Sequence, residues 1–145
     1  MAVEAIPKGY HTVTPYLTVT DARGLLDFIK KAFGAKENHV MRGPDGAIGH
    51  ADLTIGDSHV MLGQARGEWT PLPAQLYLYV ADCDGAYRQA LAAGGTSVQE
   101  PQTMFYGDRH AAVKDCCGNL WWVATHVEDV SNEELERRAK AARPS

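Results

Sequence analysis

Residues 15–35 read PYLTVTDARGLLDFIKKAFGA, and residues 76–96 read LYLYVADCDGAYRQALAAGGT. In each segment an alternating run of apolar and polar residues leads to an aspartate, and an amphipathic stretch then continues to a glycine. Aligning Asp21 with Asp82 gives an offset of 61 residues between the two segments. Repetition at a fixed offset indicates that one structural unit occurs twice in the chain.

The first unit is predicted to contain a strand, a helix and three further strands. Residues 12–19 alternate as a half-buried strand does, and this pattern places Val13 on the buried face. Asp21 is suited to cap the helix that follows, and Gly34 is suited to end it. A turn sequence, PDG, separates the first two of the remaining strands. These strands are predicted at 36–42, 47–55 and 59–64.

The second unit has the same order, and a linker at 63–74 joins it to the first. Its elements are predicted as a strand at 75–81, a helix at 82–93, and strands near 97–104, 109–115 and 119–126. Ser131 and Glu134 form a capping box, which predicts a C-terminal helix over about 131–143.

The predicted fold class is therefore α+β, with two βαβββ modules in a single domain over 1–145. The modules are expected over about 12–64 and 75–126. One module alone would bury a small core, so we expect the two to combine. The expected arrangement is a curved eight-stranded mixed sheet, with the helices outside and a concave cleft on the other face.

Composition excludes several classes of partner. The chain has 145 residues, a net charge of −4 and no block of lysine or arginine, so neither nucleic acid nor an acidic membrane surface is an expected partner. No apolar run approaches the roughly 20 residues of a membrane helix. The first residues lack the basic and apolar regions of a secretory signal, and the cysteine number is odd, at three. We therefore expect reduced thiols and a cytoplasmic location.

Several segments together resemble the vicinal oxygen chelate superfamily, which includes glyoxalase I, bleomycin-resistance proteins and extradiol dioxygenases. The resemblance covers about 12–126 and rests on YLTVTDARGLLDFIKKAFGA, GHADLTIGDSHVML, YVADCDGAYRQALAAGG and YGDRHAAVKDCCGNLWWVATHVEDV. The last segment is similar to that of the PhnB-like branch, although Cys116 and Cys117 replace the Pro-Phe of the branch pattern. We interpret this cysteine pair as turn residues in preference to a vicinal disulfide. The resemblance also implies a homodimer.

Metal-using members of the superfamily hold a divalent cation with residues from the first and last strand of each module. The matching positions here are occupied by Thr14, Met61, Gln75 and Trp122. Zinc, iron or manganese would require imidazole, carboxylate or thiolate ligands, so the family's metal centre is expected to be absent. No cofactor is expected either. An alternative set, His50, Asp52 and His59, would rebuild a metal site on neighbouring strands.

Covalent catalysis has little support, because the chain contains no G-x-S-x-G motif. Glu68 and Glu100 are expected in solvated loops. The Asp108-Arg109 pair is expected either to position the loop at 105–110 or to offer Arg109 to an anionic ligand. His110 is expected to face the solvent near a strand end, as is His126.

The remaining cleft positions are aromatic or apolar with a few polar groups, which is typical of a small-molecule pocket. The expected function is metal-free binding of a small, planar or aromatic molecule, as in bleomycin-resistance-type proteins. The first alternative is a metal-dependent lyase, isomerase or dioxygenase with His50 and His59 as nonstandard ligands. The second is a metal-independent enzyme with a cleft histidine or a loop glutamate as base. The expected ligand-binding residues are Thr14, Tyr16, His50, Met61, Trp69, Gln75, Tyr77, Phe105, Arg109 and Trp122.

Overall fold

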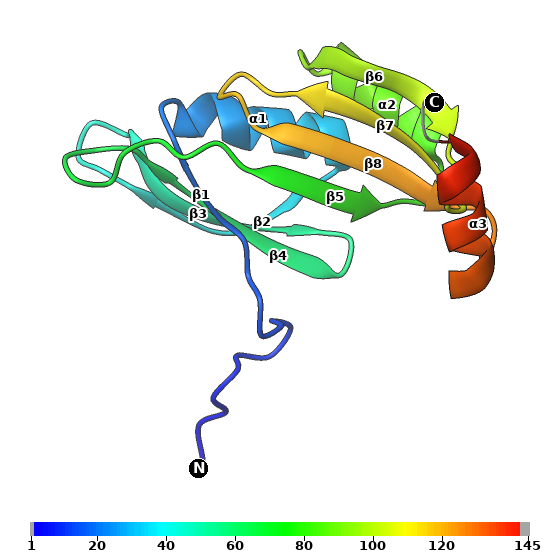
Figure 1. Ribbon diagram of the computed structural model, residues 1–145. Helices are drawn as coiled ribbons and strands as arrows, with labels where there is room; N and C mark the ends of the chain where they lie inside the picture. Colours follow the sequence, from blue (N-terminus) through cyan, green and yellow to red (C-terminus); the bar gives the residue numbers. More distant parts are fainter. Residues whose placement is uncertain (1, 143–145) are drawn as a thin grey trace.

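The computed structural model describes residues 2–142, which form eight strands and three helices (Figure 1). The first module consists of β1 (Tyr16–Val19), α1 (Ala22–Phe33), β2 (Lys36–Arg42), β3 (Ile48–Ile55) and β4 (Ser58–Gln64). The second module consists of β5 (Gln75–Tyr79), α2 (Cys83–Ala92), β6 (Thr96–Thr103), β7 (Asp108–Lys114) and β8 (Leu120–His126). A last helix, α3, spans Asn132–Ala142. The predicted α+β class with two βαβββ modules is confirmed.

The eight strands are divided between two mixed sheets of four strands. The strand order is β1-β4-β3-β2 in the first sheet and β5-β8-β7-β6 in the second. The pairs β1·β4 and β5·β8 are parallel, and the other pairs are antiparallel. Across residues 2–142 no strand of one sheet pairs with a strand of the other, so each module is a separate sheet.

Both module helices begin at the predicted aspartates. The carboxylate of Asp21 accepts a hydrogen bond from the backbone N–H of Gly24 at 2.9 Å, and that of Asp82 accepts from Gly85 at 3.1 Å. These bonds satisfy backbone donors that the first helical turn leaves free. Gly34 ends α1 with a φ of 65°, a left-handed conformation that glycine adopts without strain.

The two modules are joined through their helices. The side-chain amide of Gln89 on α2 donates to the carbonyl oxygen of Lys31 on α1 at 2.8 Å. The ring of Phe33, at the end of α1, lies 5.1 Å from that of Trp121 on β8, measured between centroids. One hydrophobic core therefore extends through both modules.

The side of each sheet that faces away from this core is called its open face here. Along β8, Trp121 and Val123 are fully buried in the core, so alternation directs Trp122 and Ala124 to the open face. The second open face carries the side chains of Gln75, Tyr77, Tyr79, Gln99, Asp108, His110, Ala112, Lys114, Trp122, Ala124 and His126. The first open face carries Tyr16, His50, Asp52, His59, Met61 and Gly63.

The first strand starts later than its alternation suggested. Val13 is 81% exposed and lies before β1, so its predicted place on the buried face is wrong. Pro15 lacks a backbone N–H, and its carbonyl accepts from Met61 at 2.9 Å just before the strand begins. At the other end, the Ser131 hydroxyl accepts from the backbone N–H of Glu134 at 3.2 Å, as the capping pattern predicted. None of the helices described is both long and apolar enough to span a membrane.

Candidate functional site

The second open face holds a row of aromatic side chains from three neighbouring strands. Tyr77 on β5 pairs with Trp122 on β8, which pairs in turn with Ala112 on β7. The rings of Tyr77 and Trp122 are stacked at an interplanar angle of 30°, with their centroids 6.1 Å apart. The His110 ring lies 4.6 Å from that of Trp122. The small side chain of Ala112, next to Trp122 in the row, is fully buried.

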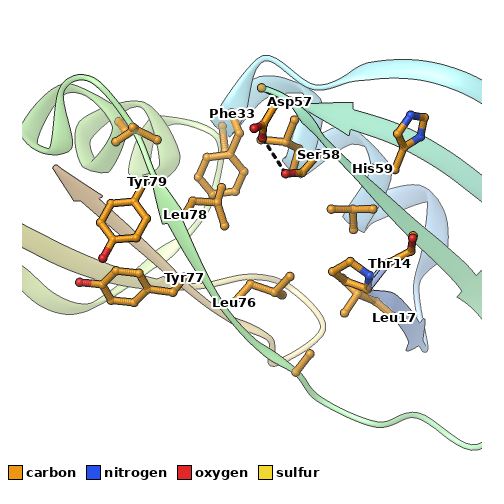
Figure 2. A pocket seen from close by; sticks show the side chains of 18 of the residues that line it. Thr14, Leu17, Phe33, Asp57, Ser58, His59, Leu76, Tyr77, Leu78 and Tyr79 are labelled. Carbon is orange, nitrogen blue, oxygen red and sulfur yellow. Dashed lines mark hydrogen bonds between the residues drawn. The ribbon is translucent and has the colours of Figure 1, made fainter. Parts of the chain in front are cut away.

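A buried carboxylate fixes two tyrosines at the edge of this row. The hydroxyls of Tyr77 and Tyr79 each donate to Oδ2 of Asp108 at 2.9 Å. Figure 2 shows their rings beside each other on β5, with the hydroxyls directed to the same side. Asp108 is 5% exposed, whereas Tyr77 and Tyr79 are 41% and 66% exposed. The two tyrosines therefore present exposed rings whose orientation is fixed by hydrogen bonds to the buried Asp108 carboxylate.

The charge of this cluster follows from its hydrogen bonds. Burial raises the pKa of Asp108, but hydrogen bonds from His126, Tyr79 and Tyr77 outweigh it and leave that pKa below its ordinary value. Burial and the same carboxylate raise the pKa of Tyr77. At neutral pH the cluster therefore contains an ionised carboxylate and neutral tyrosines.

His110 is buried, contrary to the expected solvent-facing position. It is 5% exposed, and burial lowers its pKa below the ordinary value. The hydroxyls of Tyr77 and Tyr106 each lie 3.1 Å from its Nδ1. Tyr106 belongs to the loop between β6 and β7, which folds back over His110. Alternation along β7 could not show this cover, because it comes from outside the strand.

The first open face has a similar pair. The hydroxyl of Tyr16 lies 3.2 Å from Nδ1 of His50, and the two rings are stacked with centroids 5.6 Å apart. Tyr16 reaches His50 across Gly63, where a Cβ atom would come within 2.6 Å of the tyrosine hydroxyl. The glycine therefore leaves the space that this contact needs.

A second buried carboxylate, Asp52, lies beside this pair. It accepts hydrogen bonds from the Tyr10 hydroxyl, from Nδ1 of His59 at 2.9 Å and from the Asn38 amide at 3.2 Å. The Tyr10 ring stacks on His59 with centroids 3.7 Å apart. Burial raises the pKa of Asp52, but these bonds outweigh it, and the pKa is lower than usual. Sequence reasoning missed Tyr10, because it lies in an N-terminal segment without periodicity.

A cavity of about 1320 Å³ runs between β4 of the first sheet and β5 of the second. Four of the predicted ligand-binding residues line it: Thr14, Tyr16, Gln75 and Tyr77. Phe33, Leu76 and Leu78 also line it, and Figure 2 shows them on the side away from the tyrosine hydroxyls. Met61 instead lines a smaller cavity of about 460 Å³ under the N-terminal segment.

Three predicted residues lie away from the aromatic row. Trp69 is 73% exposed in the linker, and Phe105 lies in the β6–β7 loop. Arg109 points to the opposite side of β7 from Asp108, and its guanidinium makes two hydrogen bonds to the carboxylate of Asp84, at 2.7 and 2.9 Å. Alternation along β7 thus directs Arg109 toward α2 and away from the aromatic row.

The predicted turn at the cysteines is present. Asp115 accepts from the backbone N–H groups of Cys117 and Asn119, and from the indole N–H of Trp121 at 2.7 Å. The sulfur atoms of Cys116 and Cys117 are 3.7 Å apart, and both thiols are free. The pair lies in the β7–β8 turn, away from the open face.

The sequence between residues 10 and 123 matches the family model described as the Glyoxalase/Bleomycin resistance protein/Dioxygenase superfamily. This match includes most of both βαβββ modules. The chain belongs to this superfamily. The expected membership is thereby confirmed at the level of the superfamily.

Relatives of this superfamily member occur in mycobacteria. The uncharacterized proteins Mb0911c of Mycobacterium bovis and Rv0887c of Mycobacterium tuberculosis are both 35% identical to it over 147 residues. The alignments cover 94% of this chain, and 94% and 84% of the two relatives.

Solved structures have the same fold. TioX from Micromonospora sp. ML1 is 28% identical, with a TM-score of 0.71 over 81% of this chain and 99% of that one. The hypothetical protein SA1046 from S. aureus is 27% identical, with a TM-score of 0.60 over 79% and 96% of the two chains. A superfamily enzyme from Burkholderia phytofirmans PsJN has a TM-score of 0.64 at 18% identity over 79% and 97%, and this likeness shows the fold alone.

The superfamily's metal positions do not fit a metal ion in this chain. The indole N–H of Trp122 donates to the side-chain oxygen of Gln75 at 2.6 Å, so these two positions bind each other. The other two positions, Thr14 and Met61, supply a hydroxyl and a thioether. Neither is a typical ligand of a divalent catalytic cation.

The two histidines of the alternative metal set lie apart, although His59 contacts Asp52. His50 pairs with Gly63 of β4, whereas His59 pairs with Thr54 of β3. The two histidines are therefore offset by four residues along the strands, or about 13 Å. Among residues 2–142, no three His, Cys, Asp or Glu side chains come together as a candidate metal site.

Proposed function

We propose that this chain binds a small, planar or aromatic organic molecule on the second open face, without a metal ion, as bleomycin-resistance-type proteins do. One observation carries the proposal: Tyr77 and Tyr79 expose their rings while a buried carboxylate holds their hydroxyls. An exposed ring held in one orientation loses little conformational entropy when a ligand stacks on it. Such rings offer a large apolar contact at low cost.

Neighbouring groups support a flat ligand. Trp122 extends the aromatic surface beside Tyr77, and Ala112 is the small residue next to it in the row. The side-chain amide nitrogen of Gln99, which pairs with Ala112 across β6 and β7, is buried and has no hydrogen-bond partner. A buried donor without an acceptor is costly, and a ligand oxygen would satisfy it only if the side chains that cover this nitrogen move aside.

The proposal also includes the cellular location, the oligomeric state and the branch of the superfamily. We propose that the chain is cytoplasmic and that it forms a homodimer. The reason for the dimer is that β1 and β5 are edge strands beside the large cavity, and a second copy would cover them. In that assembly the predicted residues of the first open face, including Tyr16 and His50, would complete the cleft. The segment from Tyr106 to Trp122 supports placement in the PhnB-like branch. We propose that residues 1–145 form a single domain.

A thermal-shift screen of planar aromatic compounds tests the proposal, because a ligand raises the melting temperature with its concentration. Each hit is then measured on Tyr77→Ala and on the control Leu72→Ala, a change in the exposed linker. We expect the shift to disappear in Y77A and to persist in L72A. A shift that survives in Y77A would place the binding site elsewhere and overturn the proposal. Light scattering measures the oligomeric state.

A second candidate function is metal-independent proton transfer, which the pair of Asp52 and His59 favours. Because the carboxylate accepts from Nδ1, Nε2 of His59 is left to act as a base. Its test is turnover of the identified ligand by the wild type and by His59→Gln. Equal turnover in both would eliminate this candidate.

A further inference from the structure

We propose that the ligand of the second open face is a cation, with its positive charge over the rings of Tyr77 and Tyr79. This inference rests on the proposed function and names the chemical class of its ligand. It derives from the ionised carboxylate behind the two rings, not from the rings alone.

The Asp108 carboxylate strengthens the attraction of the two tyrosine rings for a cation. Each tyrosine hydroxyl donates to Oδ2 of Asp108, and a hydroxyl that donates to an anion transfers electron density toward its ring. The negative face of an aromatic ring attracts a cation. Because the ring centroids of Tyr77 and Tyr79 are 5.4 Å apart and the planes meet at 66°, they form two walls of a corner. A planar cation could stack on one wall and meet the edge of the other.

The neighbouring positive charges are already paired. Arg109, next to Asp108 in sequence, faces away and binds Asp84. Arg138 on α3 binds the carboxylates of Glu128 and Glu134. Neither guanidinium is available to an anionic ligand at the tyrosines.

Among residues 2–142, three further basic groups belong to the face itself. The hydroxyl of Tyr77 lies 3.1 Å from Nδ1 of His110, and burial lowers the pKa of that histidine and favours its neutral form. His126 lies between Asp108 and Asp129, with its two ring nitrogens 2.9 and 2.7 Å from their carboxylates. Lys114 is at the far end of β7, six residues or about 20 Å from Asp108. Within the described part of the chain, the tyrosine corner therefore has a carboxylate behind it and no unpaired positive group beside it.

The experiment compares three flat probes of similar size: N-methylquinolinium as the cation, quinoline as the neutral molecule and 2-naphthoate as the anion. Binding to the full chain is measured by calorimetry at pH 7.5 and at two salt concentrations. We expect the cation to bind about three- to tenfold more tightly than quinoline, and naphthoate to bind most weakly. Added salt should reduce the difference.

Variants separate the carboxylate from the rings. Asp108→Asn should bring the affinities for the cation and for quinoline together, because it removes the charge behind the rings. The control Asp45→Asn removes the same charge from an exposed turn of the first module and should keep the preference. If D108N fails to fold, as judged by circular dichroism, Tyr79→Phe provides a partial comparison. It keeps the ring, the carboxylate and the Tyr77 hydroxyl but removes one of the two bonds to Asp108, so it should reduce the cation preference.

The outcomes distinguish the inference from the function on which it rests. Equal binding of the cation and quinoline, with both lost in Tyr77→Ala, would overturn the cation preference and leave the proposed function standing. Preferential binding of naphthoate would do the same. A cation preference that D108N or Y79F leaves unchanged would also overturn the inference. Failure of all three probes to bind would count against both.

Discussion

The hydroxyl of Tyr77 lies 3.1 Å from Nδ1 of His110. Tyr16 and His50 make the equivalent contact in the first module, at 3.2 Å. In both modules the tyrosine comes from the edge strand and the histidine from the third strand of its sheet. The internal repeat therefore includes a side-chain pair on the open face as well as the backbone.

The histidines of the second module should titrate on opposite sides of the ordinary pKa. Burial lowers the pKa of His110, whereas hydrogen bonds to Asp108 and then Asp129 raise that of His126. A titration followed by NMR of the ring protons should give one value below about 6.5 and one above it. Assignment uses His110→Gln and His126→Gln, and the reverse order would contradict the hydrogen bonds described.

These shifts also set the pH dependence of stability. Because the folded pKa of His126 is raised, its stabilising charge is fully present below about pH 6.5 and is lost as the pH rises through the raised value. The melting temperature should fall over that range in the wild type and fall less in H126Q. An identical decline in both proteins would show that another group is responsible.

Replacing Gly107 should destabilise the protein more than replacing Gly118. Both have positive φ angles, 97° and 85°, but a Cβ at Gly107 would collide with the carbonyl oxygen of Glu128, whereas at Gly118 it would meet nothing within 4 Å. We expect Gly118→Ala to cost about 1 kcal/mol and Gly107→Ala about 3 kcal/mol or more in the free energy of unfolding.

Urea denaturation measures the difference in the free energy of unfolding between G107A and G118A. Hydrogen exchange adds a local test, because the backbone N–H groups of Val127 and Glu128 both donate to the carbonyl of Gly107. Their protection should decrease in G107A and remain in G118A. Equal destabilisation by G107A and G118A would mean that the backbone around Glu128 can shift at little cost in free energy.

Asp115→Ala should be among the more damaging single substitutions in the second module. The carboxylate accepts four hydrogen bonds, including those from Asn119 Nδ2 and Trp121 Nε1, and both of those residues are fully buried. Leaving such donors unpaired should cost about 3 kcal/mol in the free energy of unfolding. Asp45→Ala, which removes a single bond in an exposed turn, should cost less than about 1 kcal/mol.

Cys116 should react slowly despite its exposure. Burial of the sulfur and the neighbouring Cys117 raise its pKa to about 12. Because the thiolate is the nucleophile, alkylation by iodoacetamide at pH 7.5 should be on the order of a hundredfold slower than that of glutathione. Mass spectrometry locates the label, with Cys116→Ser as the control. Alkylation at the rate of glutathione would contradict the raised pKa.

Periodicity and local capping signals were sufficient to predict the order of the strands and helices. The alternating runs, the capping aspartates and the glycines gave the eight strands and three helices in their order, because each signal lies within its own element. The division into two sheets could not be predicted this way. It depends on contacts such as that of Phe33 with Trp121, which join residues far apart in the chain.

The site was predicted less completely. Alternation placed Tyr16, Tyr77 and Trp122 on one side of their strands, but it gave no account of the hydrogen bonds that fix them. Asp108 was considered with its neighbour Arg109, although successive strand residues point to opposite faces. The same rule, applied strictly, would have grouped Asp108 with His110.

The separation of the eight strands into two sheets has a consequence for how specificity changes. Each open face is built by four strands of one module, so a substitution on one face leaves the partners of the other untouched. Distant substitutions that share no partners have additive effects. Substitutions on one open face can therefore change the ligand contacts of that module while the hydrogen bonds on the other face stay as they are.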